Sequence, residues 1–244
     1  LDVGQRVVFL GSGGLAEQVV HHAAAVFAVP DGVSAETAAA IPINYCTTLY
    51  ALHDRGELQA GESLLVTGAA GGTGTAAIQL GKAAGARVIA VAGGAEKAEL
   101  AARVGADVVI DHQQTPDWVD AVRAASDGGV DVAYDPVGGD TFHQVRRCMG
   151  WDGRLLVIGF VAGIPEVATN HALLKSYSIV GVHWGASLAK FPESLRTQMT
   201  TLLGMASTGA VDPPLYPPYP FESAASALQD LADRKTYGKV VVRR

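Results

Sequence analysis

Residues 64–91, LLVTGAAGGTGTAAIQLGKAAGARVIAV, decide how this chain folds. The stretch begins with an apolar run and continues through a glycine-rich turn. A segment with apolar residues at helical spacing follows, and a second apolar run ends the stretch. This order predicts a buried strand, a tight turn, a helix and a second buried strand, which is the repeating unit of a parallel sheet.

The same alternation of apolar strands and helical segments continues on both sides of this stretch. Most of the strands are separated by segments with helical periodicity, such as AEKAELAARVGA. Continuously apolar strands joined by helices indicate a doubly wound parallel α/β sheet with both faces covered. The six predicted strand cores are SLLVTG, RVIAVA, DVVID, DVAYDP, RLLVIGF and SIVGVHW.

Outside this region the chain has shorter elements. RVVFLGSGGLAEQVVHH predicts a hairpin around residues 11–14. A helix is predicted over residues 192–207, followed by an extended crossing at DPPLYPPYPF, a helix at ESAASALQDLAD and a final strand at GKVVVRR. We therefore expect a dinucleotide-binding domain over residues 46–207 and a second domain formed by residues 1–45 and 208–244.

Composition narrows the class of protein. The 244 residues are 49% hydrophobic and 17% charged, and the net charge of −6 argues against a nucleic-acid partner. Cys46 and Cys148 are expected to be buried free thiols, which indicates a reducing compartment, the cytoplasm. No apolar run reaches the roughly 18–20 residues of a membrane span, and no signal peptide is visible. The chain starts without Met inside a predicted strand, so we expect that N-terminal sequence is missing.

The glycine turn fits the dinucleotide pattern G-x-G-x-x-G except at its first position, where Ala69 stands. Gly71 and Gly74 occupy the second and third positions, which allow approach to a pyrophosphate and close packing of helix on strand. Alanine is acceptable at the first position if its φ is negative. Gly72 adds another bare amide at the helix N-terminus, where an anion is favoured.

The acidic residue that binds the ribose of NAD is absent. It normally follows about 20 residues after the glycine turn, but the chain has Ala92, Gly93 and Gly94 there. A 2′-phosphate would find space and a nearby cation, Lys97. The alternative for Lys97 is an exposed helix lysine. The combination predicts NADP(H) rather than NAD(H).

Other chemistries fit the sequence less well. It contains no H-E-x-x-H motif or cysteine cluster, so no metal is expected. GSG at residues 11–13 lies in a predicted hairpin and not in a nucleophile elbow, and no tyrosine has a lysine four residues later, which excludes the short-chain dehydrogenases. An S-adenosylmethionine methyltransferase has the same order of strand, glycine turn and helix, but Lys97 would have no function in such a site.

Hydride transfer would then depend on positioning. Asn44 and Tyr45 are our candidates for the mouth of a catalytic site. A packed aromatic side chain remains the alternative for Tyr45, and an amide bonded to the backbone remains the alternative for Asn44. Arg234 could reach a 2′-phosphate or be a solvated helix-end residue, and the loop after Asp135 could approach the nicotinamide.

Several stretches resemble one known family: AETAAAIPINYCTTLYAL, residues 58–92, ARVGADVVID, LLKSYSIVGVHWG and RKTYGKVVV. The chain resembles the zinc-independent medium-chain dehydrogenases/reductases, in the quinone oxidoreductase and enoyl reductase-like branch. The resemblance implies a six-stranded Rossmann sheet with a partial GroES-like β-barrel domain. It also implies metal-free, NADPH-dependent reduction of a small lipophilic quinone or α,β-unsaturated carbonyl by a homodimer without nucleic-acid or membrane partners.

The resemblance also carries site residues and two departures from the family. Members have a long segment before VGQRV, which is absent here. The loop after RVVFLGS is also very short and contains none of the cysteines that bind structural zinc in the alcohol dehydrogenase relatives. The first departure leaves an alternative function, an NADPH-binding protein without turnover. The residues implied to contact cofactor are Thr47 on the nicotinamide side, Gly71, Gly72, Thr73 and Gly74 at the pyrophosphate, Lys97 and His112 near the adenosine phosphate, and Ile158, Gly159, Phe160, Val182, His183 and Trp184 at strand ends.

Overall fold

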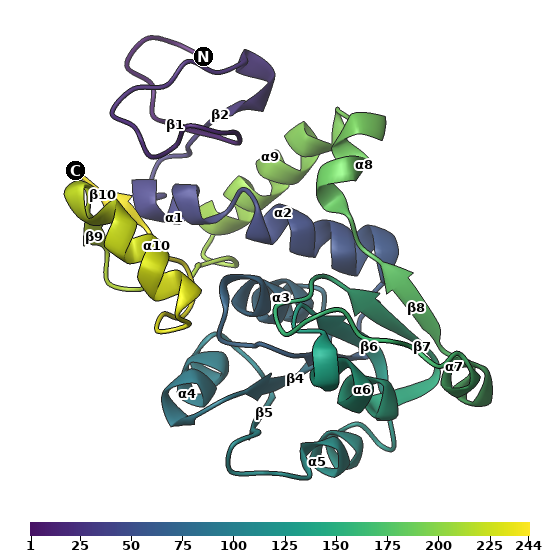
Figure 1. Ribbon diagram of the computed structural model, residues 1–244. Helices are drawn as coiled ribbons and strands as arrows, with labels where there is room; N and C mark the ends of the chain where they lie inside the picture. The colour runs from purple at the N-terminus through teal and green to yellow at the C-terminus, as the bar shows by residue number, and fades with distance from the viewer. The chain divides into compact units, whose positions relative to one another are not determined.

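The structure is a computed structural model that describes residues 1–244, and the chain separates into two compact units. The first unit comprises Leu1–Cys46 and Trp184–Arg244, and the second comprises Thr47–His183. Figure 1 labels most of the helices and strands of both units. The contacts group residues 184–207 with the first unit, whereas the sequence placed them in the dinucleotide-binding domain. The predicted domain boundaries themselves stay a prediction.

The second unit is built on a six-stranded sheet in which every neighbouring pair is parallel. The strand order is β5-β4-β3-β6-β7-β8, so the first strand in sequence lies at the centre and the order reverses beside it. This is the doubly wound Rossmann order, which confirms the predicted fold class. The strands are β3 (Ser63–Val66), β4 (Arg87–Ala92), β5 (Val108–Asp111), β6 (Val130–Asp135), β7 (Met149–Val157) and β8 (Ser178–Gly181).

Helices connect these strands and form the layers that bury the sheet. The predicted helices after the first two strands are confirmed as α3 and α4. On one face α5 packs beside α6, and on the other α3 packs beside the π-helical segment η2. The helical elements are α2 (Asn44–Leu49), η2 (Tyr50–Arg55), α3 (Gly72–Ala83), α4 (Ala95–Arg103), α5 (Trp118–Ala125), α6 (Gly139–Cys148) and α7 (Asn170–Lys175).

Alternate residues of the central strands point into two different cores. Leu65 and Ile89 belong to a buried cluster with residues of α5 and α6, such as Phe142. The neighbouring Leu64 points to the opposite face, where a Cβ on Gly81 of α3 would come within 2.5 Å of its Cδ2 atom. Because both faces are buried, β3 and β4 are apolar at every position after their first residue, which explains the continuous runs in the sequence.

Two ion pairs tie loops to the amino-terminal edge of this sheet. Lys82, at the end of α3, lies 2.7 Å from Asp107, whose carboxylate also accepts a 2.7 Å bond from the Val88 amide. Arg154 in β7 lies 2.7 Å from Glu62, before β3. The first pair lies beside the starts of β4 and β5, and the second joins β7 to the segment before β3.

The first unit contains two small sheets. β1 (Val7–Phe9) pairs antiparallel with β2 (Val26–Ala28), and β9 (Tyr219–Pro220) pairs parallel with β10 (Val242–Arg243). The predicted hairpin is therefore wrong in its second strand: residues 17–22 form no strand, and β1 pairs with the next apolar segment instead. These two sheets are separate and lie in the unit for which a partial barrel was predicted.

Helices and an extended crossing make up most of the rest of the first unit. The extended crossing predicted at residues 212–221 is confirmed over residues 212–220, which contain no helix, whereas Phe221 begins a 3-10 helix. The Tyr216 amide in this segment bonds to the Lys239 carbonyl. Both cysteines are buried and free, and burial raises the pKa of each thiol to about 12. The helices are η1 (Ala23–Ala25), α1 (Ala35–Ala40), α8 (Trp184–Lys190), α9 (Ser194–Ser207), η3 (Phe221–Ser223) and α10 (Ala224–Ala232).

Candidate functional site

The glycine turn lies between β3 and α3, at the centre of the carboxyl-terminal edge of the sheet. Gly68 has a positive φ of 57°, whereas Ala69 is not among the residues with positive φ. Gly71 then caps α3 in an extended conformation with a φ of −79°. The left-handed turn residue is thus Gly68, one position before the predicted site of the first glycine. This explains why alanine is accepted at position 69.

Gly74 cannot carry a side chain without movement of the backbone. A Cβ there would meet the Gly68 carbonyl oxygen and would come within 2.7 Å of the Ala69 Cα. This close approach is the packing role of the third glycine in a dinucleotide turn. Gly71 is exposed, and Gly72 and Thr73 are half-buried, so the backbone here reaches the surface.

The first turn of α3 suits an anion. It contains no acidic side chain that would neutralise the helix dipole. The amides of residues 72–74 lack partners within the helix because of their position in its first turn. Amides without partners in the helix and an uncompensated positive helix end can bind a phosphate group. The residues present therefore fit the pyrophosphate of a dinucleotide.

A second part of the nucleotide site lies where β4 and β5 end. The His112 imidazole packs against Gly93, and a Cβ on Gly93 would lie 2.6 Å from its Nε2 atom. Lys97 is half-buried in the first turn of α4, which Gly94 caps. The structure therefore brings Gly93, Gly94 and His112 together and places Lys97 on the adjoining helix.

The carboxylate at this place, that of Asp111, is occupied by hydrogen bonds from the backbone. Asp111 accepts hydrogen bonds from the backbone amides of Gly94 (2.8 Å) and Gln113 (3.0 Å). These bonds lower the pKa of its carboxyl group. The acidic group therefore holds the loop in place, and Lys97 and His112 provide the groups suited to a phosphate.

The loops after β6 and β7 are fastened together by backbone bonds. The buried Asp135 carboxylate accepts bonds from the Thr67 hydroxyl (2.7 Å) and the Val137 amide (3.0 Å). The Ile158 amide bonds to the Asp135 carbonyl at 3.0 Å, and a Cβ on Gly159 would lie 3.2 Å from the Pro136 oxygen. Phe160 is 46% exposed. Residues 158–160 thus follow a strand end, as predicted from the sequence.

The remaining candidates in the second unit also lie at or near strand ends. Val182, which follows β8, bonds to the Val157 carbonyl through its amide at 3.1 Å, and His183 is exposed. Thr47 is half-buried, while its neighbour Thr48 is buried with its hydroxyl 2.9 Å from the Tyr134 hydroxyl. Contact of these residues with a cofactor stays a prediction.

Asn44, in the first unit, has a partner that sequence reasoning missed. The Lys239 ammonium donates a short hydrogen bond to the Asn44 Oδ1 atom. Burial lowers the pKa of this lysine. A lysine inside the apolar run GKVVV was the available signal, because a buried charge needs a partner.

Tyr45 and Trp184 are packed within the first unit. Tyr45 is fully buried, and burial together with the charge of Asp212 raises the pKa of its hydroxyl. The Trp184 indole is 6% exposed and donates to the Gln198 Oε1 at 2.8 Å. These positions favour packing roles, and catalytic or cofactor contact by either residue stays a prediction.

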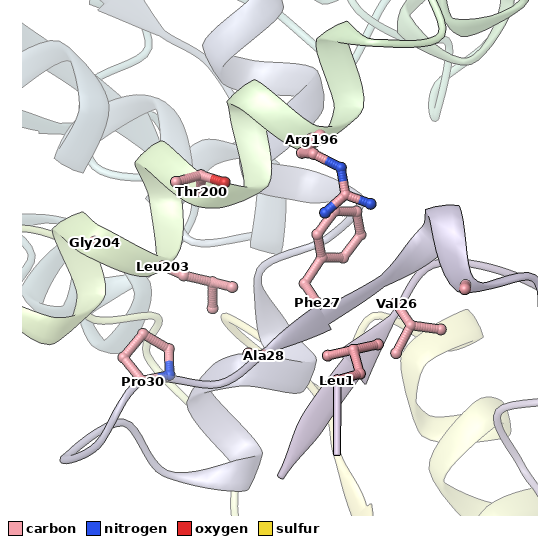
Figure 2. Close-up of a pocket in the computed structure, with 10 residues that line it drawn as sticks. Leu1, Val26, Phe27, Ala28, Pro30, Arg196, Thr200, Leu203 and Gly204 are labelled. Atoms are coloured by element: carbon pink, nitrogen blue, oxygen red, sulfur yellow. The ribbon is translucent and has the colours of Figure 1, made fainter. Parts of the chain in front are cut away.

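The first unit also has a cavity of about 880 Å³, shown in Figure 2. The Arg196 guanidinium lies 5.6 Å from the Phe27 ring centroid. None of the predicted site residues lines this cavity, and its lining pairs no acidic side chain with Arg196. Its lining includes Leu1, Val26, Phe27, Pro30, Arg196, Thr200 and Leu203.

The structure lacks two kinds of feature. It contains no group of three or more His, Cys, Asp or Glu side chains placed to hold a metal ion. None of its helices combines the length and the apolarity needed to cross a membrane.

Comparison with known proteins agrees with this geometry. A family model described as "Zinc-binding dehydrogenase" matches residues 72–201. The mouse "Quinone oxidoreductase-like protein 2" is 35% identical over 243 residues, which cover 98% of this chain and 69% of the mouse protein.

Solved structures agree as well. A probable oxidoreductase from Mycobacterium abscessus superposes with a TM-score of 0.89 at 37% identity, over 99% of this chain and 73% of that one. The quinone oxidoreductase of Thermus thermophilus, solved also in complex with NADPH, gives a TM-score of 0.86 at 32% identity, over 100% and 78% of the two chains. The chain therefore belongs to the zinc-independent medium-chain dehydrogenase/reductase family, in its quinone oxidoreductase-like branch.

Proposed function

We propose that this protein is an NADPH-dependent oxidoreductase that reduces a quinone or an α,β-unsaturated carbonyl without a metal. The observation that carries the proposal is the corner formed by Gly93, Gly94, Lys97 and His112. It presents two nitrogen-bearing side chains, Lys97 and His112, to a 2′-phosphate, while the Asp111 carboxylate is occupied by backbone amides. The relative from Thermus thermophilus, described as a quinone oxidoreductase complexed with NADPH, supports both the cofactor and the substrate class.

The residues of the second unit bind and orient the cofactor in this proposal. The first turn of α3 holds the pyrophosphate through its amides, and Lys97 holds the 2′-phosphate. Hydrogen bonds to Asp135 hold the loops after β6 and β7 in place. These loops would give the flat nicotinamide ring a rigid surface to pack against. The bound cofactor would supply the hydride. The protein supplies alignment, which can lower the barrier by several kcal/mol, up to about 7–11.

Asn44 is our candidate for stabilising the negative charge that develops on the substrate oxygen. Lysine can only donate hydrogen bonds, so the Lys239 ammonium requires that Asn44 turn its Oδ1 atom toward it. The Nδ2 donor must then point away from Lys239. A side-chain amide held in one orientation is a suitable donor to an oxyanion.

The first test is a fluorescence titration of the purified protein with NADPH and, separately, with NADH. One or two charge-assisted bonds to the 2′-phosphate, each about 1.5–3 kcal/mol, predict at least a tenfold preference for NADPH. Loss of NADPH absorbance in the presence of quinones and enones then measures turnover. Equal affinity for NADPH and NADH would contradict a 2′-phosphate site formed by Gly93, Gly94, Lys97 and His112. Selective binding without turnover would support the alternative, an NADPH-binding protein.

We further propose a homodimer, as the family resemblance implies. β8 is an outer strand of the sheet, so one of its edges is unpaired within this chain, and Ile179 on it is 39% exposed. Pairing of two β8 edges across a twofold axis would extend the sheet. Light scattering after size exclusion should show a dimer for the parent protein and a monomer for Ile179→Lys. A cytoplasmic location stays a prediction.

A further inference from the structure

A group of basic and polar side chains gathers at the edge of the sheet opposite the glycine turn. Arg146 lies in the last turn of α6, His171 and Lys175 lie on α7, and Tyr177 immediately precedes β8. The His171 and Tyr177 rings touch edge to face with their centroids 5.7 Å apart. Strands β7 and β8 begin here, whereas the nucleotide turns lie where strands end.

Three buried polar atoms in this group have no hydrogen-bond partner. They are the Tyr177 hydroxyl, the Arg146 Nε and the His171 Nδ1. Tyr177 is only 5% exposed, so its hydroxyl has little contact with water. An unsatisfied buried donor is costly, and three in one place indicate a shared acceptor. Arg146 and His171 are only half-buried, which leaves a route from solvent.

The charged side chains that act on His171 and Lys175 are basic. The pKa of His171 is lowered by burial and by the positive charges of Arg146 and Lys175. The pKa of Lys175 is lowered in turn by burial and by Arg123 and Arg147. None of these arginines, nor Lys175, takes part in an ion pair of the structure.

Lys175 anchors the group. Its ammonium donates to the carbonyls of Arg147 and Met149, both at 3.0 Å. These bonds join the end of α7 to the point where α6 passes into β7. Lys175 therefore lies near the three unpartnered atoms while its own hydrogen bonds go to backbone carbonyls.

We propose that Arg146, His171 and Tyr177 form a binding site for a small oxyanion of the phosphate class. The guanidinium Nε–H, the imidazole N–H and the phenol O–H each donate to one oxygen, and Lys175 contributes long-range attraction. A water molecule could satisfy the donors but would leave the like charges uncompensated. An anion does both. The site is separate from the nucleotide site and does not depend on the proposed function.

The test is a titration with inorganic phosphate at constant ionic strength, with chloride as the balancing ion. The Arg146 Nε–H signal in a nitrogen–proton NMR spectrum, assigned by its loss in Arg146→Gln, should shift and saturate. In Tyr177→Phe the affinity should fall at least tenfold. The matched control Arg103→Gln, an exposed arginine at the end of α4, should bind phosphate as the parent does. Methyl phosphate, compared with phosphate, tells whether a free ion or a phosphate ester is preferred.

Thermal unfolding provides the second readout. Phosphate should raise the midpoint of the parent and Arg103→Gln proteins, and the rise should be smaller in Arg146→Gln and Tyr177→Phe. Without phosphate, Tyr177→Phe should unfold at or above the parent temperature, because it removes an unsatisfied hydroxyl. Phosphate bound at the glycine turn would stabilise all four proteins equally. Such equal stabilisation, or the lack of a saturable Nε–H shift, would overturn the proposal.

Discussion

Gly74→Ala is the sharpest test of the glycine turn. The added methyl group would meet the Gly68 carbonyl oxygen and lie within 2.7 Å of the Ala69 Cα. These are backbone atoms, so no side chain can move aside, and a cost near the upper end of the overpacking range, about 3 kcal/mol, is expected. The better helix propensity of alanine offsets at most about 1 kcal/mol. The net expectation is a loss of about 2 kcal/mol in the free energy of unfolding.

The matched control is Gly204→Ala in α9. A Cβ there would have nothing within 4 Å. The same substitution should therefore stabilise the protein by about 0.5–1 kcal/mol, through helix propensity alone. Urea unfolding measures both values, and NADPH affinity should fall in Gly74→Ala only. Equal effects of the two substitutions on unfolding would refute the close contact between α3 and the turn.

Three further predictions concern single charged side chains. Lys97→Gln should weaken NADPH binding at least tenfold and leave NADH binding unchanged, because only NADPH carries the 2′-phosphate; parallel losses for both cofactors would contradict this role. Lys239→Met should lower kcat more than it changes KM, because it frees the Asn44 amide to turn, and NADPH affinity should stay the same. An unchanged kcat would show that Asn44 has no part in the mechanism. Burial raises the pKa of Asp107, but bonds from Lys82 and a backbone amide outweigh it, so the pKa is lowered overall. Its stabilising contribution should be present above about pH 4 and be lost as the pH falls through the lowered pKa. The stability difference between the parent and Asp107→Asn, measured by urea unfolding across pH, should accordingly shrink in acid; a difference independent of pH would contradict the ion pair.

Local patterns predicted most of the nucleotide-binding sheet. Strands buried on both faces must be apolar throughout, and the helices between them must show a 3.6-residue period, so both can be recognised without knowing their partners. The glycine turn and the missing acid at residues 92–94 are likewise local. For that reason the structure has α3 and α4 where the sequence placed them.

The unit with short strands was predicted less well. The sequence placed the partner of β1 at residues 17–22, but the structure pairs β1 with Val26–Ala28. Strands of two or three residues have too few positions for an alternating pattern to specify their register. Pairing in this unit is set by contacts that the local sequence does not encode.

The sequence by itself determined the class of sheet and the position of the glycine turn, and it predicted a phosphorylated cofactor, because each depends on residues close together in the chain. Tertiary structure alone decided which distant groups meet. Lys239 reaches Asn44 across 195 positions, Asp135 braces the end of β3 from 68 positions away, and Arg146 lies beside His171 and Tyr177. Such pairs form because chain segments are packed together by burial of apolar surface, and polar groups brought along must then find partners.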